Sequence, residues 1–233
     1  LPWNGYAVYT GERATMTLLP FEEQDTSFSR VASASDWYLN IKLESNNQIN
    51  HSTVLGRRKH ASNGAGIFDA PMFPGIEKNI SIAMDLDGST GFKYIRDIRS
   101  LDDFNGVWNL RINDLGDEFM ISSNQMGPFP EGLQVGLVNI NERKVLLNFV
   151  DHKEVISNNK NSVYDLKVIA GDQEYVKSMS QEILSSIPEE FFLGQNYPNP
   201  FNPITQMEYS LPQSSKVVIS IYNVLGQEIK TLV

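Results

Sequence analysis

The sequence contains no cysteine, and this absence excludes several kinds of chemistry. A chain without thiols forms no disulfides, has no thiolate nucleophile and offers no cysteine ligands for zinc. Histidine is also rare, since only His51, His60 and His152 are present. A Ser-His-Asp triad needs a positioned histidine, and no Gly-x-Ser-x-Gly turn presents a serine nucleophile. We therefore expect the three histidines to be surface residues and the chain to have no catalytic residues.

Long apolar runs are missing as well, and basic residues cluster at one place only. No apolar stretch approaches the ~18 residues of a membrane span, which argues against membrane insertion. The chain has 28 acidic and 19 basic residues and a net charge of −9, with a basic cluster only at Arg57-Arg58-Lys59. This balance argues against nucleic acid and anionic membranes as partners. The chain starts at Leu1 without a basic and then apolar leader, so we expect a mature or fragmentary form of a longer precursor.

What the sequence does contain is a series of short alternating segments. In residues 36–44, apolar side chains occupy every second position, which is the period of a half-buried strand. Further segments of this kind come after it, with turn signals roughly every ten residues: 80–86, 107–113, 118–123, 133–138, 144–149 and 164–170. This spacing is typical of all-β sandwiches. We therefore predict an all-β chain whose residues 31–172 form an antiparallel immunoglobulin-like β-sandwich, with this core: Trp37, Leu39, Ile41, Leu43, Ile82, Met84, Trp108, Leu110, Ile112, Leu137, Leu147, Leu166 and Val168.

The remaining segments flank this domain. Residues 1–30 are interpreted as a β-hairpin, the tail of an upstream β-module, followed by a linker. Residues 56–79 are rich in glycine and proline and are interpreted as a long loop, either a crossover between the two sheets or a functional loop. Residues 173–194 are more polar and are interpreted as a linker. One short helix remains open there, because three apolar residues are spaced four apart: Tyr175, Met179 and Ile183.

Two carboxylates form the weak calcium candidate of the chain. Asp85 and Asp87 stand two residues apart before Gly88, and oxygen ligands at this spacing can hold Ca²⁺. An EF-hand is excluded, because its twelfth position, an acidic ligand, is occupied by Arg96. The alternative is a β-turn after a strand, in which Asp and Gly supply the turn chemistry. We expect no other cofactor.

Aromatic side chains are the candidates for carbohydrate binding. Trp37 and Trp108 are in phase with the apolar residues of their strands, so we expect them in the core. Trp3 and Tyr38 are the better candidates for exposure. Two residues do not make a binding platform, so carbohydrate binding stays an alternative.

A proline-rich stretch near the C-terminus organises the end of the chain. Residues 195–203 read Gln-Asn-Tyr-Pro-Asn-Pro-Phe-Asn-Pro. The prolines remove backbone donors and push the residues before them towards extended conformations, so neither a helix nor a central strand fits. We interpret this stretch as a stiff, exposed connector whose two aromatics can dock on the residues C-terminal to it. Three short strands are predicted after it, at 206–212, 216–222 and 227–233, with a turn at 223–226.

The C-terminal residues closely resemble the type A C-terminal sorting domain of the type IX (Por) secretion system of Gram-negative bacteria. The resemblance covers about the last forty residues, and such a domain normally continues for several more strands. It implies that residues 195–233 are the N-terminal half of a sorting domain, a partial second β-sandwich. The sorting-motif residues implied are Asn196, Tyr197, Pro198, Asn199, Pro200, Phe201, Asn202, Pro203 and Gly226.

The resemblance also implies export across the outer membrane, to the cell surface or the medium. The expected partners are the type IX secretion machinery, neighbouring copies or upstream domains of the same protein. The chain would then be the non-catalytic C-terminal part of a large secreted or cell-surface protein. Two alternatives stay open: accessory domains of a secreted enzyme, such as a peptidase with an upstream catalytic domain, or a carbohydrate- or surface-binding module.

Overall fold

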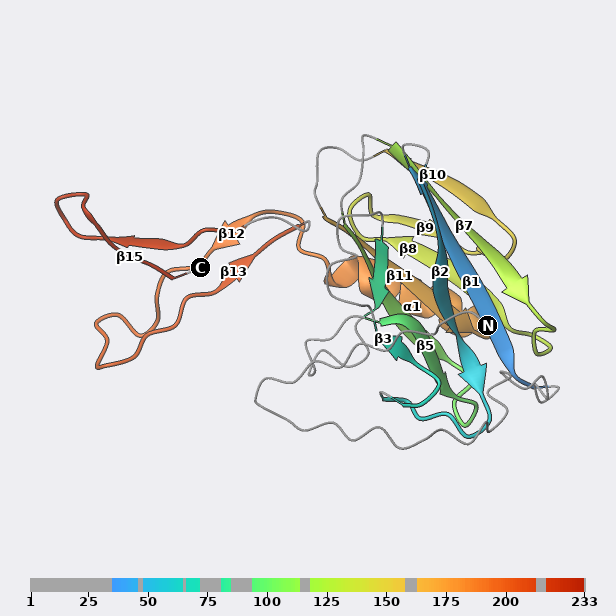
Figure 1. Ribbon diagram of the computed structural model, residues 1–233. Helices are drawn as coiled ribbons and strands as arrows, with labels where there is room; N and C mark the ends of the chain where they lie inside the picture. The colour runs from blue at the N-terminus through green and yellow to red at the C-terminus, as the bar shows by residue number, and fades with distance from the viewer. Residues whose placement is uncertain are drawn as a thin grey trace, which may run out of the picture.

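The computed structural model describes residues 35–45, 48–64, 66–71, 81–84, 94–113, 118–157, 163–212 and 217–232 (Figure 1). The predicted hairpin and linker of residues 1–30, including Trp3, lie outside these ranges, as do Asp85 and Asp87. The described residues form strands and one helix, with these bounds: β1 (Trp37–Ser45), β2 (Gln48–Arg58), β3 (Ala70–Pro71), β4 (Ser81–Met84), β5 (Tyr94–Ser100), β6 (Gly106–Asn113), β7 (Glu118–Met126), β8 (Gln134–Asn139), β9 (Lys144–Leu146), β10 (Lys153–Ser157), β11 (Val163–Gly171), α1 (Gln173–Ser186), β12 (Phe192–Leu193), β13 (Tyr209–Ser210), β14 (Ser220–Tyr222) and β15 (Glu228–Thr231).

The all-β prediction is confirmed, and most of the strands join one sheet. Eleven strands form this sheet in the order β10-β7-β1-β2-β5-β4-β6-β11-β8-β9, and β3 pairs with β5 at its side. The prediction of a purely antiparallel sheet is wrong for one pair, since β2 and β5 run parallel. Parallel neighbours need a crossover of roughly a dozen residues or more, and residues 59–93 between β2 and β5 provide that length.

The sheet curls around a single core. The Trp37 ring on β1 meets the Trp108 ring on β6 at a centroid distance of 5.9 Å, although three strands separate them in the sheet. Phe119 on β7 likewise meets Tyr164 on β11 at 5.3 Å. Both contacts are edge-to-face, a favourable geometry for aromatic pairs. The two halves of the sheet therefore share one apolar interior.

Ten of the predicted core residues are confirmed, because their side chains are buried: Trp37, Leu39, Ile41, Leu43, Trp108, Leu110, Ile112, Leu137, Leu166 and Val168. The side chains of Ile82 and Met84 lie outside the described residues. The prediction for Leu147 is wrong, because its side chain is 48% exposed. β9 ends at Leu146, and after it the chain turns so that Phe149 enters the core instead.

Five strands were not predicted from the sequence: β2, β3, β5, β10 and β12. β2 overlaps the first residues of the loop predicted at 56–79, and β3 lies within that loop, while β5 and β10 lie where no strand was expected. β5 carries Arg96, Asp97 and Arg99 in its middle, so hydrophobicity does not alternate along it. Because the interior face of this strand is polar, a search for apolar periodicity does not detect the strand.

Helix α1 replaces most of the predicted linker. Asp172 caps it by accepting a hydrogen bond from the Tyr175 N–H at 2.8 Å. Its buried positions are Val176, Ser180 and Ile183. Val176 and Ile183 pack on Val138 of β8 and Ile169 of β11, on the face of the sheet opposite to the main core. Residues 173–186 therefore pack on the large sheet, and we call the sheet and this helix the β domain. Of the three apolar residues whose spacing suggested a helix, Ile183 is buried, and Tyr175 and Met179 are half-buried beside it.

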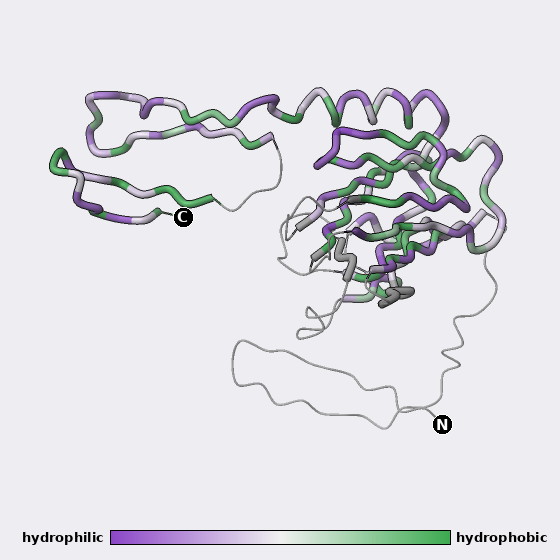
Figure 2. The backbone as a smooth tube through the Cα atoms, turned by 90° about the horizontal axis from the view of Figure 1, so that it is seen from above, coloured by the Kyte–Doolittle hydropathy of each residue, from purple (hydrophilic) through white to green (hydrophobic). Residues whose placement is uncertain are grey.

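The C-terminal residues project away from the sheet beyond the end of α1 (Figures 1 and 2). They form two separate two-stranded ladders, β12 with β13 and β14 with β15. The three predicted strands are present in shortened form, and β12 lies in the predicted linker. None of the helices among the described residues has the length and apolarity needed to span a membrane.

Candidate functional site

The proline-rich stretch forms the tip of an irregular hairpin between β12 and β13. Tyr197 and Gln206 exchange backbone hydrogen bonds of 2.8 and 2.9 Å, which close the base of this tip. Asn196 Nδ2 donates to Thr205 Oγ1 at 3.1 Å, and that hydroxyl donates to the Pro198 carbonyl at 2.9 Å. As predicted, the prolines lie outside helices and strands. These contacts hold the nine-residue motif in one loop instead of an extended connector.

The aromatic residues of the motif face solvent. Tyr197 is 80% exposed and Phe201 is 57% exposed. The expectation that they dock on the residues C-terminal to the motif is therefore wrong for the described part of the chain. An exposed tyrosine and phenylalanine on a restrained loop are available to a partner. Burying them in an interface would remove apolar surface from water, which favours binding.

Gly226 belongs to the turn that joins β14 and β15. The turn predicted at 223–226 is confirmed, with the Asn223 carboxamide accepting from the N–H groups of Leu225 at 2.9 Å and Gln227 at 3.0 Å. Gly226 has a φ of 76°, a conformation that glycine adopts at no steric cost. The role of this glycine is thus to shape the hairpin.

Exposed apolar side chains gather in the C-terminal ladders. A two-stranded hairpin is marginally stable alone in water, and contiguous exposed apolar surface marks interaction sites. Most of the large hydrophobic side chains that are exposed among the described residues lie here: Phe191, Phe192, Leu193, Tyr197, Phe201, Ile204, Met207, Tyr209, Val218, Ile221, Tyr222, Val224, Leu225, Ile229 and Leu232. We call residues 191–232 the C-terminal segment. Among the residues of this segment that the structure describes, none belongs to a core cluster of buried apolar side chains.

A groove lies where the C-terminal segment meets the β domain. It has a volume of about 570 Å³. Its lining combines an Arg111–Asp165 ion pair of 3.0 Å with Leu211 and Pro212 of the C-terminal segment. Nearby, Arg143 donates to the carbonyls of Ile187 and Pro188. The connector after α1 is therefore anchored to the β domain, where the sequence suggested a flexible linker.

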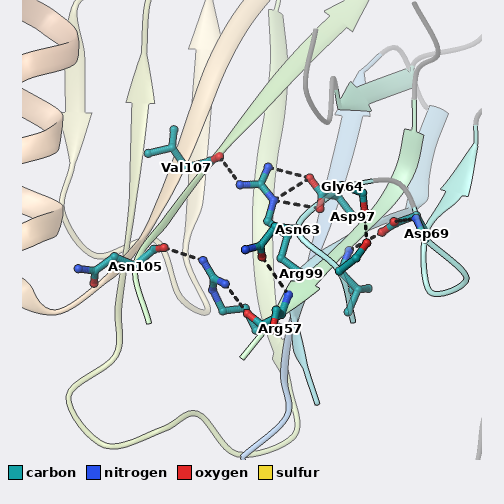
Figure 3. A network of polar contacts seen from close by, with 12 residues as sticks. Arg57, Asn63, Gly64, Asp69, Asp97, Arg99, Asn105 and Val107 are labelled. Carbon is teal, nitrogen blue, oxygen red and sulfur yellow. Dashed lines mark hydrogen bonds and ion pairs between the residues drawn. The ribbon is translucent and has the colours of Figure 1, made fainter. Parts of the chain in front are cut away.

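A polar network occupies the inner face of β2 and β5 (Figure 3). Asp97 is 1% exposed and accepts hydrogen bonds from Arg99 Nε and Nη2, the latter at 2.9 Å. Arg99 Nη1 donates to the Val107 carbonyl at 2.9 Å. The neighbouring Arg57 donates to the carbonyls of Ser100 and Asn105. Both guanidinium groups lie over the Trp108 ring, at 4.6 Å for Arg99 and 5.6 Å for Arg57.

Burial shifts the pKa values of charged groups in this network. It raises the pKa of the Asp97 carboxyl, against the opposing effect of Arg99. It also lowers the pKa of the Arg57 guanidinium, with Arg99 acting in the same direction. The Asp97 oxygens bind Arg99 and are shielded from solvent, so they are not placed to act as a general base. We interpret this network, which the sequence did not predict, as a structural clamp between β2, β5 and β6.

The loop after β2 covers backbone amides of β5. Asp69 accepts from the Ile98 N–H at 2.8 Å and from the Gly66 N–H at 2.7 Å (Figure 3). Asn63 accepts from the Ser100 N–H at 3.2 Å. These side chains take the place of a neighbouring strand where the short β4 no longer pairs with β5.

Replacing Asp69 by alanine is expected to speed hydrogen exchange at the Ile98 amide by about tenfold or more. The variant leaves this N–H without its acceptor, at a cost of about 1–3 kcal/mol. Amide exchange followed by NMR measures the effect. Asp102→Ala is the matched control, because Asp102 accepts from the Ser100 hydroxyl and not from the Ile98 amide. Unchanged exchange at Ile98 in Asp69→Ala would contradict the capping role.

The histidines and the metal candidates are the remaining groups that could support chemistry. His60 is exposed, and His152 Nε2 lies 3.7 Å from Glu154 Oε2 at the surface, so both are the surface residues that were expected. The side chain of His51 and the calcium candidates Asp85 and Asp87 lie outside the described residues. Within the described ranges, no group of three histidine, aspartate or glutamate side chains could hold a metal ion.

Comparisons of the chain with protein-family models, with curated proteins and with solved structures found no match. The candidate site is the sequence motif of residues 195–203 with the exposed surface around it. The structure brings the eight residues Asn196 to Pro203 together in one loop. Gly226 is in the separate β14–β15 hairpin.

Proposed function

We propose that the chain is the non-catalytic C-terminal part of a large secreted or cell-surface protein that the type IX secretion system exports. The single observation that carries the proposal is the resemblance of residues 195–233 to a type A sorting domain. The exposure of Tyr197 and Phe201 on a restrained loop supports it, because an export signal must be readable from outside the folded protein. The β domain is then cargo, which we propose to be a variant of the immunoglobulin-like sandwich.

The secretion machinery is the proposed partner of the C-terminal segment. The two ladders β12–β13 and β14–β15 have free edges among the described residues, and such edges invite pairing with a strand from another chain. Their exposed apolar side chains add surface that a partner would cover. Neighbouring copies or upstream domains of the same protein are the other partners that this surface could accept.

Export is tested in the full-length precursor, expressed in a bacterium that has a type IX system. Replacing Pro198, Pro200 and Pro203 together by alanine is expected to leave most of the protein inside the cell, because the loop loses its fixed backbone. Surface labelling and cell fractionation measure this distribution. The control replaces Pro130 in the β7–β8 loop and Pro188 after α1, and this variant should reach the surface. Normal export of the triple variant would contradict the assignment of the motif.

A further inference from the structure

The outer face of β1, β2 and β5 carries an unusual combination of side chains for so acidic a chain. We call Tyr38, Asn40, Arg58, Phe68 and Arg96 the polar shelf. The strand registers bring the strand residues of the shelf near one another, because Tyr38 pairs with Gly56, Asn40 pairs with Val54, and Val54 pairs in turn with Arg96. Phe68, in the loop after β2, is placed by its contact with Arg58. Arg58 lies two positions after Gly56 on the same face of β2.

Gly56 lets the aromatic ring of the shelf lie close to the sheet. A Cβ atom added to Gly56 would lie 3.0 Å from Tyr38 Cδ1 and 2.2 Å from the Trp37 carbonyl oxygen. The half-buried Tyr38 ring thus lies against the backbone of β2. An aromatic face fixed in this way gives a flat apolar surface, against which the C–H face of a sugar ring can pack.

Two arginines flank this ring. Burial and Asp36 raise the pKa of Tyr38, and both Arg58 and Arg96 oppose this shift. Arg58 lies over the Phe68 ring at 4.5 Å, and its Nε is 3.8 Å from Asp36. Burial lowers the pKa of Arg96, with Asp69 opposing this effect. Because both cations are partly withdrawn from water, an anionic ligand would interact with them more strongly than with fully hydrated side chains.

An amide pair lies next to the ring. Asn40 Nδ2 donates to Asn124 Oδ1 at 3.3 Å across β1 and β7. Asn40 Oδ1 is buried and has no hydrogen-bond partner among the described residues. A ligand hydroxyl that reached this oxygen would supply the missing hydrogen bond and remove the cost of leaving it unpaired.

We propose that the polar shelf binds an acidic polysaccharide, with a sugar ring on Tyr38, its carboxylates on Arg58 and Arg96, and a hydroxyl on Asn40. The two arginines are separate cations, and each has an acidic neighbour: Asp36 for Arg58 and Asp69 for Arg96. A polymer whose carboxylates are spaced apart fits such an arrangement. Nucleic acid or an anionic membrane would instead bring dense negative charge to a chain with a net charge of −9. This activity belongs to the β domain and is independent of the proposed export signal.

Affinity electrophoresis of the purified full chain tests the proposal. Polygalacturonate is the probe, and the same polymer with methyl-esterified carboxyl groups is the neutral control. The chain should be retarded by the acid form alone. This result cannot come from general charge attraction, since both protein and polymer are negative. Arg58→Gln and Arg96→Gln should each weaken the apparent Kd about tenfold, the effect expected from losing one charge-assisted hydrogen bond.

Arg111→Gln is the matched control, because it removes the same charge from an exposed arginine outside the shelf. It should bind as the wild type does. Circular dichroism checks the fold, and Arg58→Lys provides a milder variant that keeps the charge but loses the planar fork, so its binding should also weaken. Absence of retardation, equal retardation by the esterified polymer, or an equal loss in Arg111→Gln would each overturn the proposal.

Discussion

Replacing Trp108 by alanine is expected to lower the free energy of unfolding by about 3–5 kcal/mol, the usual range for truncating a large core aromatic. The Trp108 side chain is fully buried and packs edge-to-face on Trp37, which joins the two halves of the curled sheet. Its ring also lies beneath the guanidinium groups of Arg57 and Arg99. The substitution therefore opens a cavity and removes two cation–π contacts together. Chemical denaturation measures the change.

Phe104→Ala serves as the comparison for Trp108→Ala. Phe104 is 41% exposed in the turn between β5 and β6, so its truncation should cost less than about 1 kcal/mol. A loss below about 1 kcal/mol in Trp108→Ala would contradict a core role. It would also revive Trp108 as a binding residue, which the sequence left as the alternative.

The predictable part of the fold is the part whose strands bury one apolar face. β1, β6 and β11 alternate cleanly, and the inward residues predicted for them are buried, although Tyr164 and Ala170 of β11 were not predicted. β2 and β5 were missed because their inward residues near Trp108 are Arg57, Asp97 and Arg99. A charged residue inside a strand is stabilised by partners from distant segments, and no local pattern reports those partners.

The candidate site could be predicted from the sequence only in part. The motif of residues 195–203 is visible in sequence because proline acts on the local backbone. The docking of α1 was harder to see, because it depends on Ile169, an outward residue of β11 that becomes buried under the helix. Gly136 permits this approach, since a Cβ there would lie 2.9 Å from Val176 Cγ1. The polar shelf likewise depends on the parallel pairing of β2 with β5, which hydrophobic periodicity does not reveal.

Replacing Arg99 by methionine is expected to destabilise the fold by about 3–5 kcal/mol at neutral pH. Asp97 accepts hydrogen bonds from two nitrogens of Arg99, Nε and Nη2, and is almost completely shielded from solvent. Methionine keeps much of the aliphatic volume over Trp108 but leaves the carboxylate buried without that partner. Chemical denaturation at pH 7 measures this loss.

The Arg111–Asp165 pair gives a matched control for Arg99→Met. Its nitrogen–oxygen distance is 3.0 Å, against 2.9 Å for Arg99–Asp97, but its side chains are 48% and 27% exposed. Arg111→Met should therefore cost less than about 1 kcal/mol, as exposed ion pairs do. Equal losses in the two variants would show that burial does not determine the strength of the Arg99–Asp97 interaction.

The loss in Arg99→Met should also depend on pH with a definite sign. Burial already raises the pKa of Asp97, and Arg99 provides the largest opposing effects, so removing Arg99 raises this pKa further. An acid whose pKa is higher in the folded state binds its proton more tightly there, so folding is favoured at low pH. Stability of the variant should fall as pH rises from the unfolded value of about 3.8 to the folded pKa of Asp97, and then level off. Unfolding curves measured between pH 3 and pH 8 test this, and the difference from wild type should be smallest at the acidic end. A difference that grows as the solution is acidified would mean that Asp97 is not the group left unpaired.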